Sequence, residues 1–290
     1  MIRNLVVLIL GLLLIFSPKL LPATNPSWIV PAGKIGLVVI DVGSEGDAQL
    51  LVSPGGETML VDTGDNNEPT AWPNLQRVLL DNKISSLNIL VITHPHQDHL
   101  GNVINVLKTF KPQLVVLSGV VHTNQTYEEM LRFIRDNNIP AVRVGTGQTL
   151  DFDKDMSVEI LGPNDLAAPN LNNTSIILKV SFGKFSALIT GDAEVEQERQ
   201  QLSTLAGKLP ATVLKAGHHG SRTSSSEEYL QAVDPELVVV SAGHGNQYGH
   251  PHEEVLNRLN RLGINTLITK SSGTITIISD GETYEVKTER

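Results

Sequence analysis

The histidines of this sequence gather in three short windows, and their grouping points to chemistry. Eight of the nine histidines fall in these windows, and each window follows a strongly apolar, strand-like run. Loops that leave the strands of a sheet are where binding and catalytic residues collect. We therefore expect a shared site rather than histidines scattered over the surface. The windows hold His94, His96 and His99, then His218 and His219, then His244, His250 and His252.

The first window, His-Pro-His-Gln-Asp-His at residues 94–99, offers two metal positions. His94 and His96 are two residues apart as the chain leaves a strand, so both can point to the same side. Asp98 and His99 enter the next helix and turn back toward a second point nearby. The chain has no cysteine, so a transition metal must be held by imidazole and carboxylate groups, which suit Zn²⁺, Mn²⁺ and Fe²⁺.

A pair of such ions needs a bridging carboxylate, and Asp192 is the candidate. It follows the apolar run 185–190 and a glycine, at the end of an expected strand. Two ions ~3.5 to 4 Å apart hold a bridging hydroxide that attacks phosphorus or a carbonyl carbon. The alternative for Asp192 is a solvated loop aspartate without a ligand role.

Apolar runs bounded by turn residues predict strands, and helical periodicity appears between them. The first three strands form an antiparallel meander, because their connections are too short for a crossover helix. Two strand-rich halves with helices between them predict an α/β (α+β) fold, in which two sheets pack face to face with helices outside. We expect one domain over residues 33–290. The expected strands are 35–42, 49–53, 58–64, 88–94, 114–118, 141–144, 156–161, 174–180, 185–190, 212–217, 236–243, 266–269, 274–279 and 283–287, and the expected helices are 73–82, 100–109, 126–137, one from about 194, 226–233 and 252–262.

Composition and charge limit the classes of function. The chain has 290 residues, 40% of them hydrophobic, which is enough for a packed core. Lys plus Arg is 22 and Asp plus Glu is 31, so the net charge is 22 − 31 = −9, which argues against nucleic-acid binding by overall charge. A local basic groove stays open, but its candidates Lys215, Arg222 and Lys270 are few.

Residues 1–32 predict export from the cytoplasm. Twelve apolar residues at 5–16 follow Arg3, in the manner of a secretory signal. A cleaved signal peptide and an uncleaved membrane anchor both fit, and the lack of a clear small-residue cleavage site favours the anchor. Prolines make residues 17–32 a linker and disfavour a third alternative, a buried N-terminal helix. We expect an extracytoplasmic protein, secreted or held at the membrane by this segment.

Seven motifs, taken in order, resemble the metallo-β-lactamase superfamily, and within it the hydrolase domain of ComEC-type competence proteins. More distantly they resemble phosphorylcholine esterases. The resemblance covers about residues 35–288 and implies a four-layer αββα sandwich that carries two divalent metal ions, Zn or Mn. The motifs are DVGSEGDA (41–48), LVDTG (60–64), THPHQDHLGN (93–102), NNTSIIL (172–178), TGDAE (190–194), LKAGHHGS (214–221) and YGHP (248–251).

The resemblance also assigns metal ligands. His94 and His96 would bind one ion, Asp98 and His99 the other, and Asp192 would bridge them. A later histidine ligand falls in the pair His218-His219. His218 is the first choice and His219 the second, and the other would contact substrate. Asp62 would orient a metal-bound histidine or water, or else it is a turn-forming aspartate.

The chain departs from lactamase-like relatives at one ligand position. A third histidine for the first ion is replaced by the stretch 172–175, so water, Asn173 or substrate would complete that site. ComEC-type proteins share this loss. Besides Asp98, two further residues are candidates for catalysis. His250 would contact a phosphate or protonate the leaving oxygen, unless it is a structural histidine at a helix start. Lys215 would stabilise an oxyanion, unless it points inward and forms a local ion pair.

These features predict a metal-dependent hydrolase of phosphodiester bonds outside the cytoplasm, and the resemblance implies a nuclease whose substrate is DNA, degraded during uptake. The expected nucleophile is the hydroxide that bridges the two ions. One alternative is hydrolysis of a smaller phosphoester, such as a choline-phosphate group of the cell envelope. Another is a non-catalytic metal-binding module of an uptake complex, which the two metal positions disfavour because a structural site would be closed.

Overall fold

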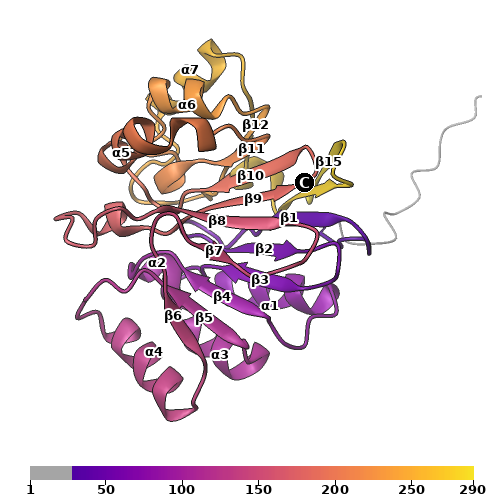
Figure 1. Ribbon diagram of the computed structural model, residues 1–290, viewed down its shortest axis with the longest axis vertical. Coiled ribbons are helices and arrows are strands. Elements are labelled where there is room, and N and C mark those ends of the chain that lie inside the picture. Colours follow the sequence, from indigo (N-terminus) through magenta and orange to yellow (C-terminus); the bar gives the residue numbers. More distant parts are fainter. Residues whose placement is uncertain (1–27) are drawn as a thin grey trace, which may run out of the picture.

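A computed structural model describes residues 28–290 as two sheets packed between two groups of helices. In Figure 1, α1 to α4 lie below the first sheet and α5 to α7 lie above the second, so the expected four-layer αββα arrangement is confirmed. The helices are α1 (Ala71–Asp81), α2 (Gln97–Leu100), α3 (Val103–Phe110), α4 (Gln125–Asp136), α5 (Val195–Leu205), α6 (Glu227–Val233), α7 (Glu253–Arg261) and α8 (Thr269–Ser272), with short 3₁₀ turns η1 (Leu171–Thr174), η2 (Ala206–Lys208) and η3 (Gly217–Gly220).

The first sheet has eight strands in the order β15-β14-β1-β2-β3-β4-β5-β6. The meander β1-β2-β3 is antiparallel as expected, and β3 to β6 then run parallel. The strands are β1 (Ile35–Val39), β2 (Gln49–Val52), β3 (Thr58–Val61), β4 (Ile89–Ile92), β5 (Leu114–Leu117), β6 (Ala141–Arg143), β14 (Ile275–Ser279) and β15 (Tyr284–Thr288).

The second sheet has seven strands in the order β13-β12-β11-β10-β9-β8-β7, and β10 to β13 run parallel. Parallel strands end at the same edge of a sheet. The loops after β3 and β4 therefore gather at one edge of the first sheet, and the loops after β10, β11 and β12 gather at one edge of the second sheet. The strands are β7 (Thr149–Leu150), β8 (Ser157–Gly162), β9 (Ile177–Phe182), β10 (Phe185–Ile189), β11 (Val213–Lys215), β12 (Leu237–Val240) and β13 (Asn265–Ile268).

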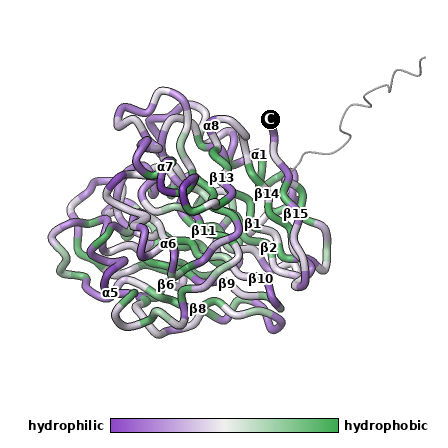
Figure 2. The backbone as a smooth tube through the Cα atoms, turned by 90° about the horizontal axis from the view of Figure 1, so that it is seen from above, coloured by the Kyte–Doolittle hydropathy of each residue, from purple (hydrophilic) through white to green (hydrophobic). Residues whose placement is uncertain are grey.

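The central strands of both sheets are buried on both faces, and their successive side chains point to opposite sides. In β1, Leu37 and Val39 pack between the two sheets, whereas Val38 packs toward α1 and α3. In β10, Ala187 lies between the sheets and Leu188 packs toward α5 and α6. Figure 2 shows the hydrophobic strands beside outer helices that are hydrophilic over much of their length. This double layer of core holds the strand ends, and therefore the site, in place.

Two differences from the expectations affect the site and the start of the folded unit. Residues Leu171–Thr174 form η1 and the strand starts only at Ile177, because the Asn170 side chain accepts a hydrogen bond from the Asn172 backbone and turns the chain. Trp28 lies in the expected linker, yet its side chain is buried in the core below the first sheet. Within residues 28–290, no helix has the length and apolarity to cross a membrane. The expected signal or anchor at 5–16 lies outside the described residues.

Candidate metal centre

Loops from both sheets meet at one end of the sandwich and bring the predicted ligands together. His94 and His96 follow β4, and Asp98 and His99 lie in the short helix α2. From the other sheet, Asp192 follows β10 and His219 lies in η3 after β11. The two halves of the fold therefore contribute to a single site.

One group of four residues surrounds the first point of this site. Its members are Asp98, His99, Asp192 and His219, and one ligand atom from each lies within 4.8 Å of all the others. His219 Nε2 is 3.1 Å from Asp98 Oδ2 and 3.5 Å from Asp192 Oδ1. His99 Nε2 is 3.2 Å from the same Asp192 oxygen. Two imidazole nitrogens and two carboxylates in this arrangement match the ligands of a divalent transition metal.

A second group of three residues surrounds a neighbouring point. His94 Nε2 is 3.0 Å from His96 Nδ1 and 3.9 Å from Asp192 Oδ2. Asp192 is therefore common to both groups, with Oδ1 turned to one and Oδ2 to the other. A carboxylate that presents one oxygen to each of two points can bridge two ions.

The donors of this centre fit a cation. Within residues 28–290, His99 Nε2 and Asp192 Oδ1 are buried and have no hydrogen-bond partner. A buried polar atom without a partner costs free energy, which a bound ion would remove. The Nδ1 atoms of His94, His99 and His219 are occupied by other contacts. Nδ1 of His94 contacts the hydroxyls of Thr93 and Ser175, at 3.2 and 3.3 Å, so its Nε2 faces the centre.

Two buried carboxylates orient the histidines of the four-residue group. Asp62 Oδ2 lies 2.7 Å from His99 Nδ1, the position expected of a residue that orients a metal-bound histidine. Asp47 Oδ1 lies 3.5 Å from His219 Nδ1, which also contacts the backbone oxygen of Ser241 at 3.0 Å. Both contacts leave Nε2 of the imidazole as the atom that faces the centre.

The carboxylates of the centre give it a strongly negative field. Burial disfavours the charged form of His99, but the carboxylates of Asp192 and Asp98 outweigh burial and raise its pKa well above the usual value. The pKa of His219 is raised well above its usual value in the same way, against burial, chiefly by Asp192 and Asp47. Burial would raise the pKa of Asp192, but His99 and His219 hold it well below the usual range. The negative charge of the carboxylates therefore favours the binding of protons or of metal cations at this centre.

His219, not His218, belongs to the four-residue group. This corrects the expectation that His218 was the first choice of metal ligand and His219 the second. Both residues adopt left-handed backbone angles, with φ of 47° at His218 and 52° at His219, so the two side chains diverge. His219 is buried in the centre. His218 is partly exposed, with Nδ1 3.0 Å from Glu194 Oε1 and Nε2 3.8 Å from Asp192 Oδ2. The structure thus places His218 beside the cavity, where a substrate would lie.

Asn173 does not face the centre, contrary to the expectation that it would help complete the first metal site. Its side chain accepts a hydrogen bond from the Glu194 backbone and donates one to Glu196. Asn172, its neighbour in η1, lines the cavity instead, and its Oδ1 is buried without a partner among the described residues. Asn172 is therefore one of the amide side chains that a ligand of this site would meet, with Gln97, Asn246 and Gln247.

Lys215 is an internal lysine and takes no part in the cavity, which corrects its candidacy as an oxyanion stabiliser. Its side chain is fully buried and donates to Asp47 Oδ2. The inward ion pair, which the sequence left open as the alternative, is the arrangement found. Because Asp47 also contacts His219, Lys215 supports the metal centre from behind.

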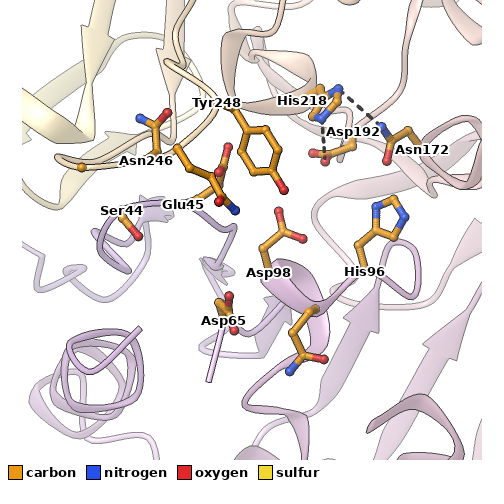
Figure 3. Close-up of a pocket in the computed structure, with 13 residues that line it drawn as sticks. Ser44, Glu45, Asp65, His96, Asp98, Asn172, Asp192, His218, Asn246 and Tyr248 are labelled. Atoms are coloured by element: carbon orange, nitrogen blue, oxygen red, sulfur yellow. Dashed lines mark hydrogen bonds and ion pairs between the residues drawn. The ribbon is translucent and has the colours of Figure 1, made fainter. Parts of the chain in front are cut away.

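The cavity over the centre measures about 580 Å³ and is open to solvent. Figure 3 shows the side chains that line it. His250 is absent from its lining, contrary to the expected contact with substrate phosphate. It is buried, with Nδ1 2.6 Å from Glu45 Oε1, and Tyr248 stacks over its ring. The residues that line the cavity are Ser44, Glu45, Asp65, His96, Gln97, Asp98, Asn172, Asp192, His218, Gly245, Asn246, Gln247 and Tyr248.

Sequence reasoning did not single out several residues that the structure places in or beside the site, among them Asp47, Asn172, Glu194 and Tyr248. All four lie inside motifs that drew attention for other residues. An aspartate two positions before a buried strand and a glutamate two positions after the candidate ligand Asp192 were the available signals.

Comparisons with known proteins agree with this geometry. A family model described as the metallo-beta-lactamase superfamily matches residues 23–244. ComE operon protein 3 of Bacillus subtilis is 33% identical over 82% of this chain and 32% of its own length. Competence protein ComA of Neisseria gonorrhoeae is 30% identical over 85% of this chain and 32% of its own length. The expected resemblance to competence proteins is confirmed, and the chain spans about a third of the length of these relatives.

The fold is also found among solved structures. The metallo-beta-lactamase fold protein YhfI of Bacillus subtilis superposes with a TM-score of 0.56 over 83% of this chain and 98% of its own, at 14% identity. That similarity shows the fold alone. With the family match over more than half of its residues, the chain belongs to the metallo-beta-lactamase superfamily.

Proposed function

We propose that this chain hydrolyses phosphodiester bonds with two divalent metal ions, and that DNA outside the cytoplasm is its substrate. The observation that carries the proposal is the pair of ligand groups that share Asp192 and open into one cavity. His94, His96 and Asp192 would hold one ion, and Asp98, His99, Asp192 and His219 the other. Two bound cations would supply an activated water and neutralise charge on the phosphoryl group.

His218 is the residue that we assign to the phosphate. Its Nδ1 donates to Glu194 Oε1, which leaves Nε2 directed toward the cavity near Asp192. Glu194 is itself fixed, because its carboxylate accepts hydrogen bonds from Asn170 and Asn172 at 2.8 and 2.9 Å. In its protonated form, a histidine held in this way donates from Nε2 to a phosphoryl oxygen without reorganisation.

The relatives support DNA as the substrate, since one of them is named as a competence protein. A specific observation favours a second candidate. Within residues 28–290, no lysine or arginine lines the cavity, whereas binding along a DNA backbone usually relies on such side chains. Hydrolysis of a small phosphoester of the cell envelope is therefore the second candidate.

The test is cleavage of end-labelled single-stranded and duplex DNA with Mn²⁺ or Zn²⁺, together with the metal content of the protein by mass spectrometry. Asp98→Asn should reduce the bound metal from two ions toward one and slow cleavage by more than about 100-fold. Asp65→Asn is the matched control, because Asp65 lines the same cavity and belongs to neither ligand group.

Three results would count against the proposal in different ways. A chromogenic phosphodiester hydrolysed by a protein that leaves both DNAs intact would favour the small phosphoester. Equal losses in Asp98→Asn and Asp65→Asn would show that the ligand assignment is wrong. A single tightly bound ion with no turnover of any ester would favour a non-catalytic metal-binding module.

A further inference from the structure

Tyr248 stands at the mouth of the cavity with most of its surface in solvent. The residue is 61% exposed, one of the most exposed large hydrophobic side chains in the described part of the chain. It also lines the cavity, and Figure 3 shows it reaching over the site with its hydroxyl end toward Asp98. An exposed aromatic ring beside a reactive centre offers a flat face on which a planar group of a ligand can stack.

The ring is held in place rather than left to move. On one side it stacks on the imidazole of His250, with ring centroids 5.7 Å apart and planes 20° from parallel. His250 is anchored in turn by Glu45, 2.6 Å from its Nδ1. The loop is fastened by Asn246, whose side chain accepts from the His250 backbone at 2.7 Å and donates to the backbone oxygens of Gly243 and His250.

Because the cavity is acidic, an uncharged stacking contact would add affinity for a nucleic acid that charge attraction does not supply. Acidic side chains line it at Glu45, Asp65, Asp98 and Asp192, and the chain as a whole carries −9. Attraction of phosphates to basic side chains therefore cannot supply much of the affinity for a polyanion. Stacking of a base on an aromatic ring is the other general source of affinity for single strands, and it tolerates any sequence.

We infer that Tyr248 is the stacking platform for the nucleobase next to the cleaved phosphodiester, and that it directs the enzyme to single-stranded nucleic acid. The inference rests on the proposed phosphodiesterase function and names its substrate class. A base that is paired in a duplex is already stacked on its neighbours and is not free to lie on the ring. One face of Tyr248 rests on His250, so the substrate base lies on the exposed side.

The test compares two single-stranded substrates of equal length and charge, oligothymidylate and an abasic oligomer with tetrahydrofuran in place of every base. Cleavage is measured with the full chain and Mn²⁺, as kcat/KM. We expect the wild-type protein to cleave oligothymidylate about tenfold faster than the abasic oligomer, and faster than a duplex.

Variants at Tyr248 separate the ring from its hydroxyl. Tyr248→Leu and Tyr248→Ala should lose the preference for oligothymidylate, because only this oligomer carries bases that can stack on the ring. Tyr248→Phe, which keeps the ring, should retain the preference. Unchanged metal content in each variant shows that the centre is intact.

Several outcomes would overturn the inference. Equal wild-type rates on the two oligomers would remove it while the phosphodiesterase function stands. A preference that survives Tyr248→Ala would assign base recognition to another residue. Loss of the preference in Tyr248→Phe would show that the hydroxyl matters and not the ring. Failure to cleave either oligomer, with a chromogenic phosphodiester still hydrolysed, would remove the nuclease function and the inference with it.

Discussion

Asp62 Oδ2 lies 2.7 Å from His99 Nδ1, and both side chains are fully buried. The same carboxylate accepts hydrogen bonds from the backbone and the hydroxyl of Thr93, at 2.8 and 2.7 Å. Asp62 is thus fixed by the strand that leads to the first metal-binding window, and it fixes His99 in turn. The contact determines which nitrogen of His99 faces the centre.

We expect Asp62→Asn to weaken metal binding by about 10- to 100-fold, the usual effect of removing a group that orients a metal-bound histidine. The amide keeps the size of the side chain but loses the charge that holds Nδ1–H. Competition with a chromogenic chelator measures the change. Asp65→Asn serves as the control, and equal metal affinity in Asp62→Asn and wild type would contradict the prediction.

Metal affinity should rise steeply with pH. In the metal-free protein, the pKa values of His99 and His219 lie well above their usual value. At His99 the charges of Asp192 and Asp98 outweigh the effect of burial. At His219 the charges of Asp192 and Asp47 do so. This shift favours the protonated form of both imidazoles, and a metal ion must displace those protons to bind Nε2. Raising the pH removes the competing protons, so affinity increases with pH.

Chelator competition between about pH 6 and pH 8, together with proton release in weakly buffered solution, measures this linkage. Asp62→Asn removes one of the charges that raise the pKa of His99 and should reduce the number of protons released. An affinity independent of pH, or no proton release on metal binding, would mean that the histidines are neutral in the metal-free protein.

Lys215 should matter for stability rather than for catalysis directly. Its ammonium group is fully buried against Asp47, and removal of one partner leaves the other charge buried alone. We expect Lys215→Met to lower the free energy of unfolding by about 3 to 5 kcal/mol, measured by urea denaturation of the metal-free protein. Lys108→Met, at an exposed site on α3, should change it by less than about 0.5 kcal/mol.

Asp47→Asn combined with Lys215→Met should restore part of that stability, because the buried carboxylate is then neutral. A double variant that is no more stable than Lys215→Met would show that the loss comes from packing and not from the unpaired charge.

The layers of the fold and most of the metal ligands followed from the sequence for physical reasons. Strands buried on both faces, such as Leu237–Val240, are continuous apolar runs that few other structures can bury. The candidate ligands of the first window, His94, His96, Asp98 and His99, lie within six residues of sequence, so their spacing determines their geometry. Asp192 follows directly from the end of β10.

The details that the sequence did not reveal depend on backbone turns and on contacts between distant segments. His218 and His219 differ in role because two successive left-handed residues turn their side chains apart, which neither residue type predicts. Lys215 points inward because Asp47, 168 positions away, meets it there. Asn172 faces the cavity and Asn173 does not because both lie in η1, a 3₁₀ turn before β9 that the sequence did not predict.

Trp28 gives the last prediction, which concerns where the folded unit begins. The indole is only 5% exposed, its Nε1 donates to Asp81 Oδ2 at 2.9 Å, and the Arg77 guanidinium lies 4.3 Å from the ring centroid. Asn82 holds the same segment, accepting from the Val30 backbone and donating to the Trp28 carbonyl, both at 3.0 Å. These contacts attach the expected linker to the end of α1.

A protein that starts at residue 33 should therefore be less stable than one that starts at residue 28. We expect Trp28→Ala to lower the free energy of unfolding by about 3 to 5 kcal/mol, the usual cost of emptying a buried tryptophan site. Trp28→Phe should cost about 1 kcal/mol through the loss of the hydrogen bond to Asp81, beyond any change in packing. Urea denaturation of the two truncated proteins and the two variants measures these differences. Equal stability of the proteins that start at 28 and 33 would mean that the contacts of Trp28 add nothing to the fold and that the domain begins at residue 33, as the sequence predicted.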